Sequence, residues 1–167
     1  DENDNFGITD AQGNIIIPMI YGTIQNFGDC FVVSNAFILN NKGEKIYDSF
    51  DGISVSSQGY PYKSSVARVT VKAEDFTESS PHVYYGIVNG GGKMALAPEY
   101  DIITDLGDGV LYAVKDGDAA FYDYDGNKIT DTSVTEIYGF SEGVAAARNA
   151  EGKWGYIKNP LDISIFK

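Results

Sequence analysis

One short pattern recurs along this chain and restricts what it can fold into. An Asp or Asn, two further residues and a Gly occur at positions 10–13, 40–43, 89–92 and 123–126. The Asp or Asn side chain can accept a hydrogen bond from a backbone N–H two residues later, and Gly can adopt the left-handed conformation of a type I turn with a G1 bulge. A short apolar run precedes each copy. The pattern therefore predicts a series of β-hairpin tips.

Two further landmarks keep the same register as these tips. The apolar runs align without gaps: their second residues fall at positions 7, 37, 86 and 120, and a fifth run, which has no tip, has its second residue at 155. A large apolar residue (Phe27, Leu106 or Phe140) follows three of the turn glycines at a constant spacing. Such agreement indicates a tandem repeat. We expect one domain covering 1–167, with units near 6–29, 30–65, 66–109, 110–143 and 144–167.

Each unit is expected to be a three-stranded antiparallel meander. In the fourth unit the arms would be residues 110–114, 119–122 and 127–130, with about a dozen less regular residues leading to the next unit. The 12 Tyr, 9 Phe and 19 Gly also favour strands and turns, and no stretch has helical periodicity. The predicted fold class is all-β, with about five units in an open β-array or solenoid. The alternative is a small five-bladed propeller-like ring.

One segment resembles a known repeat. Residues 140–145 read Phe-Ser-Glu-Gly-Val-Ala, and residues 151–157 read Glu-Gly-Lys-Trp-Gly-Tyr-Ile. This segment closely resembles the bacterial WG (KWG) repeat. Positions 6–7 and 85–86 keep the glycine of the Trp-Gly pair, whereas 36–37 and 119–120 lose the pair. The resemblance implies a non-catalytic module of a secreted or cell-envelope bacterial protein, and it supplies no catalytic residues.

Charge and composition exclude several classes of partner. The formal net charge of −12 repels phosphate backbones, so nucleic acid is not an expected partner. No apolar run reaches the roughly 18 residues of a membrane helix, so direct membrane insertion is not expected either. The chain opens at Asp1, and we expect any targeting segment to lie outside it. The single cysteine, Cys30, precedes an apolar run and is predicted to be a buried thiol.

No motif predicts a metal, a cofactor or a catalytic group. Residues 123–127 place carboxylates at alternate positions before a glycine, but they lack the remaining ligands of a calcium loop and fit a hairpin tip better. Residues 89–93 lack the spacing of a phosphate-binding loop. The chain has a single histidine, His82, and no Gly-x-Ser-x-Gly turn. A pair of carboxylates among the 24 acidic residues leaves a glycoside hydrolase as a third hypothesis.

The second and third units carry insertions, and long loops on a regular scaffold often hold binding residues. We therefore predict ligand-binding residues at Tyr60, Tyr62, Phe76 and His82. Trp154 is predicted to fill the core between units. The leading hypothesis is a module for protein–protein interaction. The second is a carbohydrate-binding module that stacks sugars on aromatic residues, with Tyr47, Tyr60, Tyr62 and Tyr84 as candidates, for example on a cell-surface glycan.

Overall fold

The computed structural model describes residues 5–55 and 66–161, and this part of the chain is built from β-strands, with no helix. Its seventeen strands form five antiparallel sheets, which we number I to V in chain order. Sheets I and II consist of β1 (Phe6–Thr9), β2 (Ile15–Tyr21), β3 (Ile24–Phe27), β4 (Cys30–Val33), β5 (Phe37–Asn40) and β6 (Lys45–Tyr47). Sheet III consists of β7 (Gly52–Val55), β8 (Val66–Lys72), β9 (Val83–Asn89) and β10 (Met94–Tyr100). Sheets IV and V consist of β11 (Ile102–Asp105), β12 (Val110–Lys115), β13 (Asp118–Asp123), β14 (Lys128–Thr132), β15 (Val134–Ile137), β16 (Val144–Asn149) and β17 (Trp154–Lys158).

Every sheet is a meander in which each strand pairs with the next strand of the chain. The predicted tandem antiparallel meanders are therefore confirmed. Sheets II, III and IV have four strands instead of the three expected, because part of the segment expected to be irregular forms a leading strand. The leading strands β3, β7 and β11 have four residues each and bury one residue each. Such a strand is too short to show an alternating pattern in the sequence.

The predicted hairpin tips are present where the turn pattern occurs. At the β13–β14 tip, Asp123 Oδ1 accepts hydrogen bonds from the backbone N–H groups of Asp125 (3.0 Å) and Asn127 (2.8 Å). Gly126 has a φ of 85°, in the left-handed region that favours glycine. A Cβ on Gly126 would also overlap the backbone carbonyl of Ala95 in the preceding sheet. This turn glycine therefore serves both its own hairpin and the contact between two sheets.

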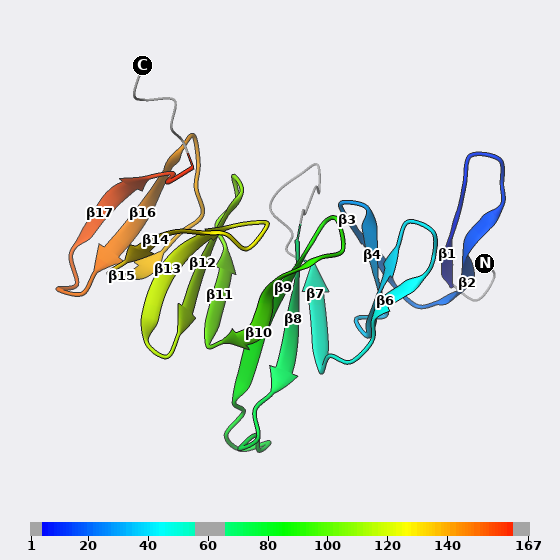
Figure 1. Ribbon diagram of the computed structural model, residues 1–167, viewed down its shortest axis with the longest axis horizontal. Coiled ribbons are helices and arrows are strands. Elements are labelled where there is room, and N and C mark those ends of the chain that lie inside the picture. Colours follow the sequence, from blue (N-terminus) through cyan, green and yellow to red (C-terminus); the bar gives the residue numbers. More distant parts are fainter. Residues whose placement is uncertain (1–4, 56–65, 162–167) are drawn as a thin grey trace.

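The five sheets follow one another along the long axis of the molecule (Figure 1), from sheet I near the N-terminus to sheet V near the C-terminus. The two ends of the row lie at opposite ends of the molecule (Figure 1). The array is open, as predicted, and the propeller-like ring is not formed. No helix long and apolar enough to cross a membrane occurs within residues 5–55 and 66–161.

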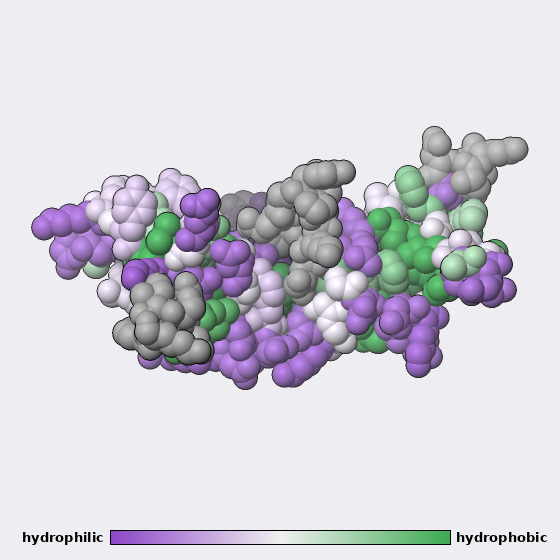
Figure 2. All heavy atoms as spheres, turned by 90° about the horizontal axis from the view of Figure 1, so that it is seen from above, coloured by the Kyte–Doolittle hydropathy of each residue, from purple (hydrophilic) through white to green (hydrophobic). Residues whose placement is uncertain are grey.

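The hydrophobic core is divided into clusters, each of which lies between two successive sheets. Ile17 of sheet I packs with Val33 and Leu39 of sheet II. The other three clusters join II to III, III to IV, and IV to V. Seen from above, hydrophobic residues gather toward the right, over sheets I and II, and hydrophilic residues form most of the lower rim (Figure 2). Each sheet is therefore stabilised mainly by its neighbours, as expected for a stacked repeat.

Candidate functional site

The predicted ligand residues fall in two regions. Tyr60 and Tyr62 lie outside the described residues. Phe76 and His82 lie in the loop between β8 and β9, where Phe76 contacts Lys72 (Nζ to ring centroid 4.6 Å). His82 Nδ1 lies 2.9 Å from Asp75 Oδ1. Both side chains therefore contact partners of their own hairpin, and their role in ligand binding stays a prediction.

The two described aromatic residues proposed for sugar stacking lie in different sheets and pack against different rings. Tyr47, in sheet II, packs against the ring of Phe50 with a centroid distance of 5.7 Å. Tyr84, in sheet III, packs against the ring of His82 with a centroid distance of 4.9 Å. A sugar platform needs exposed rings placed side by side, and these two rings each have a protein partner instead.

Cys30 is a buried thiol, as the sequence predicts. Its exposed fraction is 1%. Burial raises the pKa of the Cys30 thiol, and the negative charge of Asp29 raises it further. The thiol is therefore protonated at neutral pH, which is the opposite of what a catalytic cysteine requires.

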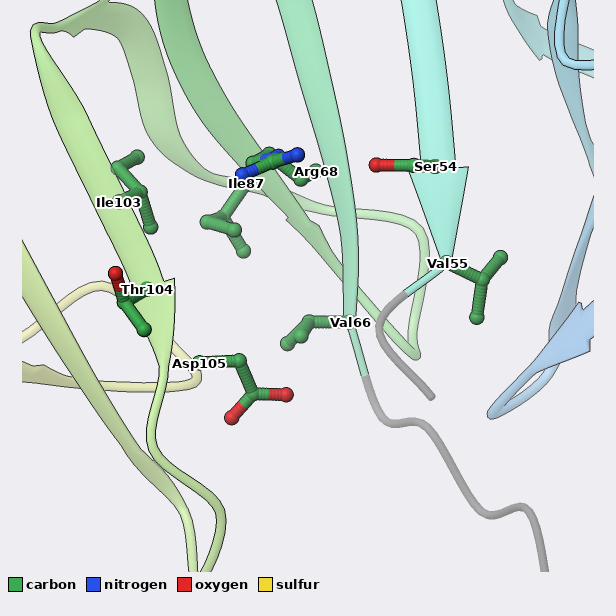
Figure 3. A pocket seen from close by; sticks show the side chains of 8 residues that line it. All are labelled: Ser54, Val55, Val66, Arg68, Ile87, Ile103, Thr104 and Asp105. Atoms are coloured by element: carbon green, nitrogen blue, oxygen red, sulfur yellow. The ribbon is translucent and has the colours of Figure 1, made fainter. Parts of the chain in front are cut away.

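A cavity of about 400 Å³ opens between sheets III and IV (Figure 3). Arg68 of β8, Ser54 of β7, and Thr104 and Asp105 at the end of β11 contribute its polar groups. The Arg68 guanidinium lies 4.8 Å from the centre of the Tyr85 ring. Asp105 Oδ1 accepts hydrogen bonds from the Tyr124 hydroxyl (2.6 Å) and the Gly107 N–H (3.0 Å). Both charged side chains thus have protein partners.

The chemistry of this cavity is limited. Burial raises the pKa of Tyr124, and its hydrogen bond to Asp105 raises it further, so the phenol stays neutral and acts as a donor. The described lining residues include no histidine, cysteine or lysine. Within the described residues, no group of three or more His, Cys, Asp or Glu side chains is placed to hold a metal ion.

The outer face of sheet V is a more distinctive surface. In sheets II, III and IV the second strand begins with Cys30, Val66 and Val110, which are each at most 1% exposed and pack in the cluster toward the next sheet. Val144 begins the second strand of sheet V and is 43% exposed. Sheet V is the last sheet in the described part of the chain, so no following sheet covers this residue.

The third strands show the same contrast. Ile38, Ile87 and Phe121 occupy one position of β5, β9 and β13, and their exposed fractions are 0%, 1% and 4%. Tyr156 occupies this position in β17 and is 82% exposed. At the positions of Val144 and Tyr156, the outer face of sheet V therefore corresponds to side chains that are buried in the interior of the array.

Aromatic and charged side chains complete this surface. The rings of Tyr138 and Trp154 stack with a centroid distance of 5.5 Å and an interplanar angle of 17°. Arg148 lies 5.9 Å from the Trp154 ring and pairs with Glu136 at 3.1 Å. We call Tyr138, Val144, Trp154 and Tyr156 the end face. Trp154 is 51% exposed, so the prediction that it fills the core between units is wrong. Phe6, at the same repeat position of β1, is also exposed (55%), so this position does not lie in the core at either end of the row.

Sequence reasoning missed the end face, although a signal for it was present. In the repeat register, Tyr156 occupies the same position of its unit as the core residues Ile38 and Ile87. The same register therefore marks Tyr156 as a position that packs against a neighbouring sheet elsewhere in the array.

The sequence of this chain is similar to one known repeat family. The family model described as "WG containing repeat" matches residues 6–29, 85–118 and 120–157, which is more than half of the chain. No curated protein matches it. Among solved structures it is similar to the computationally designed Ika8 protein (10% identity, 93% of this chain, 53% of that chain, TM-score 0.39) and the computationally designed Ika4 protein (15%, 81%, 91%, 0.36). The chain spans about half the length of the Ika8 protein. By its sequence match, this protein is a member of the WG-containing repeat family.

Proposed function

We propose that this chain is a non-catalytic repeat module that binds a protein partner through the end face. The observation that carries the proposal is the exposure of Tyr156 at a position that sheets II, III and IV bury. The corresponding faces of sheets II, III and IV each pack against the next sheet. The exposed apolar and aromatic side chains of sheet V are therefore suited to pack against a further protein surface. Its Trp, Tyr and Arg side chains are also the types most enriched among residues that dominate binding energy.

The non-catalytic part of the proposal is supported by the state of the reactive side chains. Cys30 is buried and protonated, and His82 lies beside Asp75 in a hairpin loop. The cavity between sheets III and IV has its charged groups engaged with protein partners. A location in the bacterial cell envelope or outside the cell stays a prediction from the family resemblance.

Carbohydrate binding is the second candidate function, because the Tyr156 ring is open to solvent. A sugar stacks on a free ring face. The Trp154 ring has Tyr138 against one face and Arg148 close by, so it offers less free surface. We therefore favour a protein partner, whose side chains can also pack around the edges of the stacked pair.

The test compares one end-face variant with a matched control. Trp154→Ser with Tyr156→Ser removes the exposed aromatic surface, and Ile102→Ser removes an exposed apolar side chain (47% exposed) from sheet IV. Each protein is used as bait in extracts of the source cells, and bound proteins are compared by quantitative mass spectrometry. We expect one protein that binds the wild type and Ile102→Ser equally and is lost with the double variant. Binding that survives the double variant would contradict the proposal, and a glycan-array signal lost in that variant would replace a protein partner with a carbohydrate.

A further inference from the structure

We propose that an extended segment of the protein partner pairs with β17 and completes sheet V as its fourth strand. This inference rests on the proposed function, since it specifies how the partner engages the surface that contains the end face. The segment would add main-chain hydrogen bonds at the sheet edge, and its side chains would take alternating positions on the two faces of the sheet.

Within residues 5–55 and 66–161, the outer edge of β17 has no paired strand, whereas the corresponding edges of four related strands are paired. The strands in the same position, β1, β5, β9 and β13, pair on their outer edges with β2, β6, β10 and β14. In sheet V the strand order is β15-β16-β17, so β17 is an edge strand, and no other described strand pairs with its outer edge. An unpaired edge of this kind is a template for a further strand.

The strands β1, β9 and β17 each have a glycine at the same position. In β1 and β9 this glycine shows how closely the next strand of the sheet approaches. A Cβ on Gly7 would lie 2.6 Å from the carbonyl oxygen of Ile17, and a Cβ on Gly86 would lie 2.8 Å from that of Leu96. Gly155 has the same position in β17, and its Cβ would meet nothing within 4 Å. The space that β2 and β10 fill beside β1 and β9 is therefore present beside β17 and is not filled by the described residues.

The chain itself turns away from this edge after β17. The backbone N–H of Asn159 donates to the Gly143 carbonyl at 2.8 Å, and its side-chain amide donates to the Asp108 carbonyl at 3.3 Å. Leu161 lies near Gly109, in the loop between β11 and β12. Residues 159–161 thus run toward sheet IV, whereas the residues that follow β1 and β9 turn back as hairpins along those strands.

The pairing of β1 and β9 defines the chemistry of the incoming strand. In sheet I, Ile8 lies opposite Ile17 and Phe6 lies opposite Tyr21. In sheet III, Ile87 lies opposite Leu96 and Tyr85 lies opposite Tyr100. In the same register, Tyr156 and Trp154 of β17 would face the incoming strand. The segment should therefore carry an aliphatic residue opposite Tyr156 and an aromatic residue four positions later, opposite Trp154. Aromatic and aliphatic pairs across strands stabilise a sheet.

The probe is a synthetic peptide with the sequence of residues 93–101 and blocked termini, added to the full chain. We expect the β17 amides to exchange with solvent about tenfold more slowly when the peptide occupies about 90% of the chains, as measured by NMR. A control peptide with the substitutions L96S and Y100S should give less than half of this protection, because it loses both side chains that pack on β17.

Two protein variants locate the site. Gly155→Val places a side chain where the incoming backbone must pass, and it has open space in the free protein. Gly22→Val makes the same change at another open glycine outside the strands and serves as the control. We expect G155V to abolish the protection and G22V to retain it.

The outcomes separate this inference from the proposed function. No protection of β17 by the peptide, or equal protection in G155V, would overturn strand addition. Slower exchange confined to β9 would also overturn it, because it would show that the peptide replaces β10. If the partner in the cell-extract experiment depends on Trp154 and Tyr156 while the peptide fails, the end face binds proteins without accepting a strand.

Discussion

Gly86 and Gly155 occupy the same position of two strands in different surroundings. A Cβ on Gly86 would lie 2.8 Å from both the Leu96 oxygen and the Pro98 nitrogen, whereas the position at Gly155 is open. We expect Gly86→Ala to lower the free energy of unfolding by about 1–3 kcal/mol through overpacking. Gly155→Ala should change it by less than about 0.5 kcal/mol. Urea unfolding followed by far-UV circular dichroism, which reports all five sheets, measures both. Equal losses would show that the close approach over Gly86 does not limit the side chain there.

The sequence identifies these glycines as landmarks of the repeat, but it does not explain them. The reason for Gly86 lies in irregular pairing: β10 shifts register between Met94 and Leu96 and again before Tyr100. These irregularities bring the backbone of β10 across β9. A bulge of this kind depends on two strands together, and a pattern within one strand does not predict it.

We expect the stability of the β13–β14 hairpin tip to depend on pH through one carboxyl group, that of Asp123. Burial opposes ionisation of Asp123, but hydrogen bonds from Asn127, Asp125 and Gly126 outweigh it and lower the pKa of the carboxyl. A lowered pKa in the folded state means that the stabilisation is present above the unfolded-state pKa. It is lost as the pH falls through the folded-state value.

Asp123→Asn tests this tip, because Asn89 forms the same turn with hydrogen bonds from the N–H groups of Gly91 (3.2 Å) and Lys93 (3.0 Å). The variant should keep the turn and lose the charge. We expect it to be less stable than the wild type at pH 7 by up to about 1 kcal/mol, with the difference vanishing at pH 2. Melting temperatures measured from pH 2 to pH 7 check this, and a difference that does not change with pH would assign the loss to geometry instead of charge.

Hairpin tips were predictable because the turn chemistry is local and is repeated. The leading strands β3, β7 and β11 were not, since each contributes about one core residue. The candidate site follows the same division. The register identified the position of Tyr156, but its exposure depends on whether a further sheet packs against β17, which no residue within the strand determines.

At the scale of the whole molecule, the local sequence pattern does not predict whether the five sheets form an open row or a closed ring. Both arrangements use the same hairpins and the same contacts between neighbouring sheets. They differ in the small rotation between successive sheets, which accumulates along the whole row and is not specified by any single turn. In the open row, sheets I and V each contact one neighbouring sheet among those described (Figure 1), so the two ends should be the least stable parts of the array.

This arrangement predicts that damage to one interface stays near it. Leu106 is fully buried, and it packs between sheets IV and V in the cluster that includes Phe140 and Ile157. Leu106→Ala should lower stability by about 2–5 kcal/mol through the cavity it leaves. In hydrogen exchange measured by mass spectrometry, we expect β15–β17 to exchange faster while β3–β6 keep their protection, because the contacts of sheet II do not involve this interface.

Ile17→Ala is the mirror-image control, because Ile17 is equally buried and packs between sheets I and II at the other end of the row. It should increase exchange in β1 and β2 and leave β15–β17 unchanged. If both variants raise exchange evenly from β1 to β17, the five sheets unfold as one cooperative unit, and stability is not the sum of neighbouring interfaces. If each variant affects its own end, the exposed end of the row can open or accept a partner without disturbing the sheets at the other end.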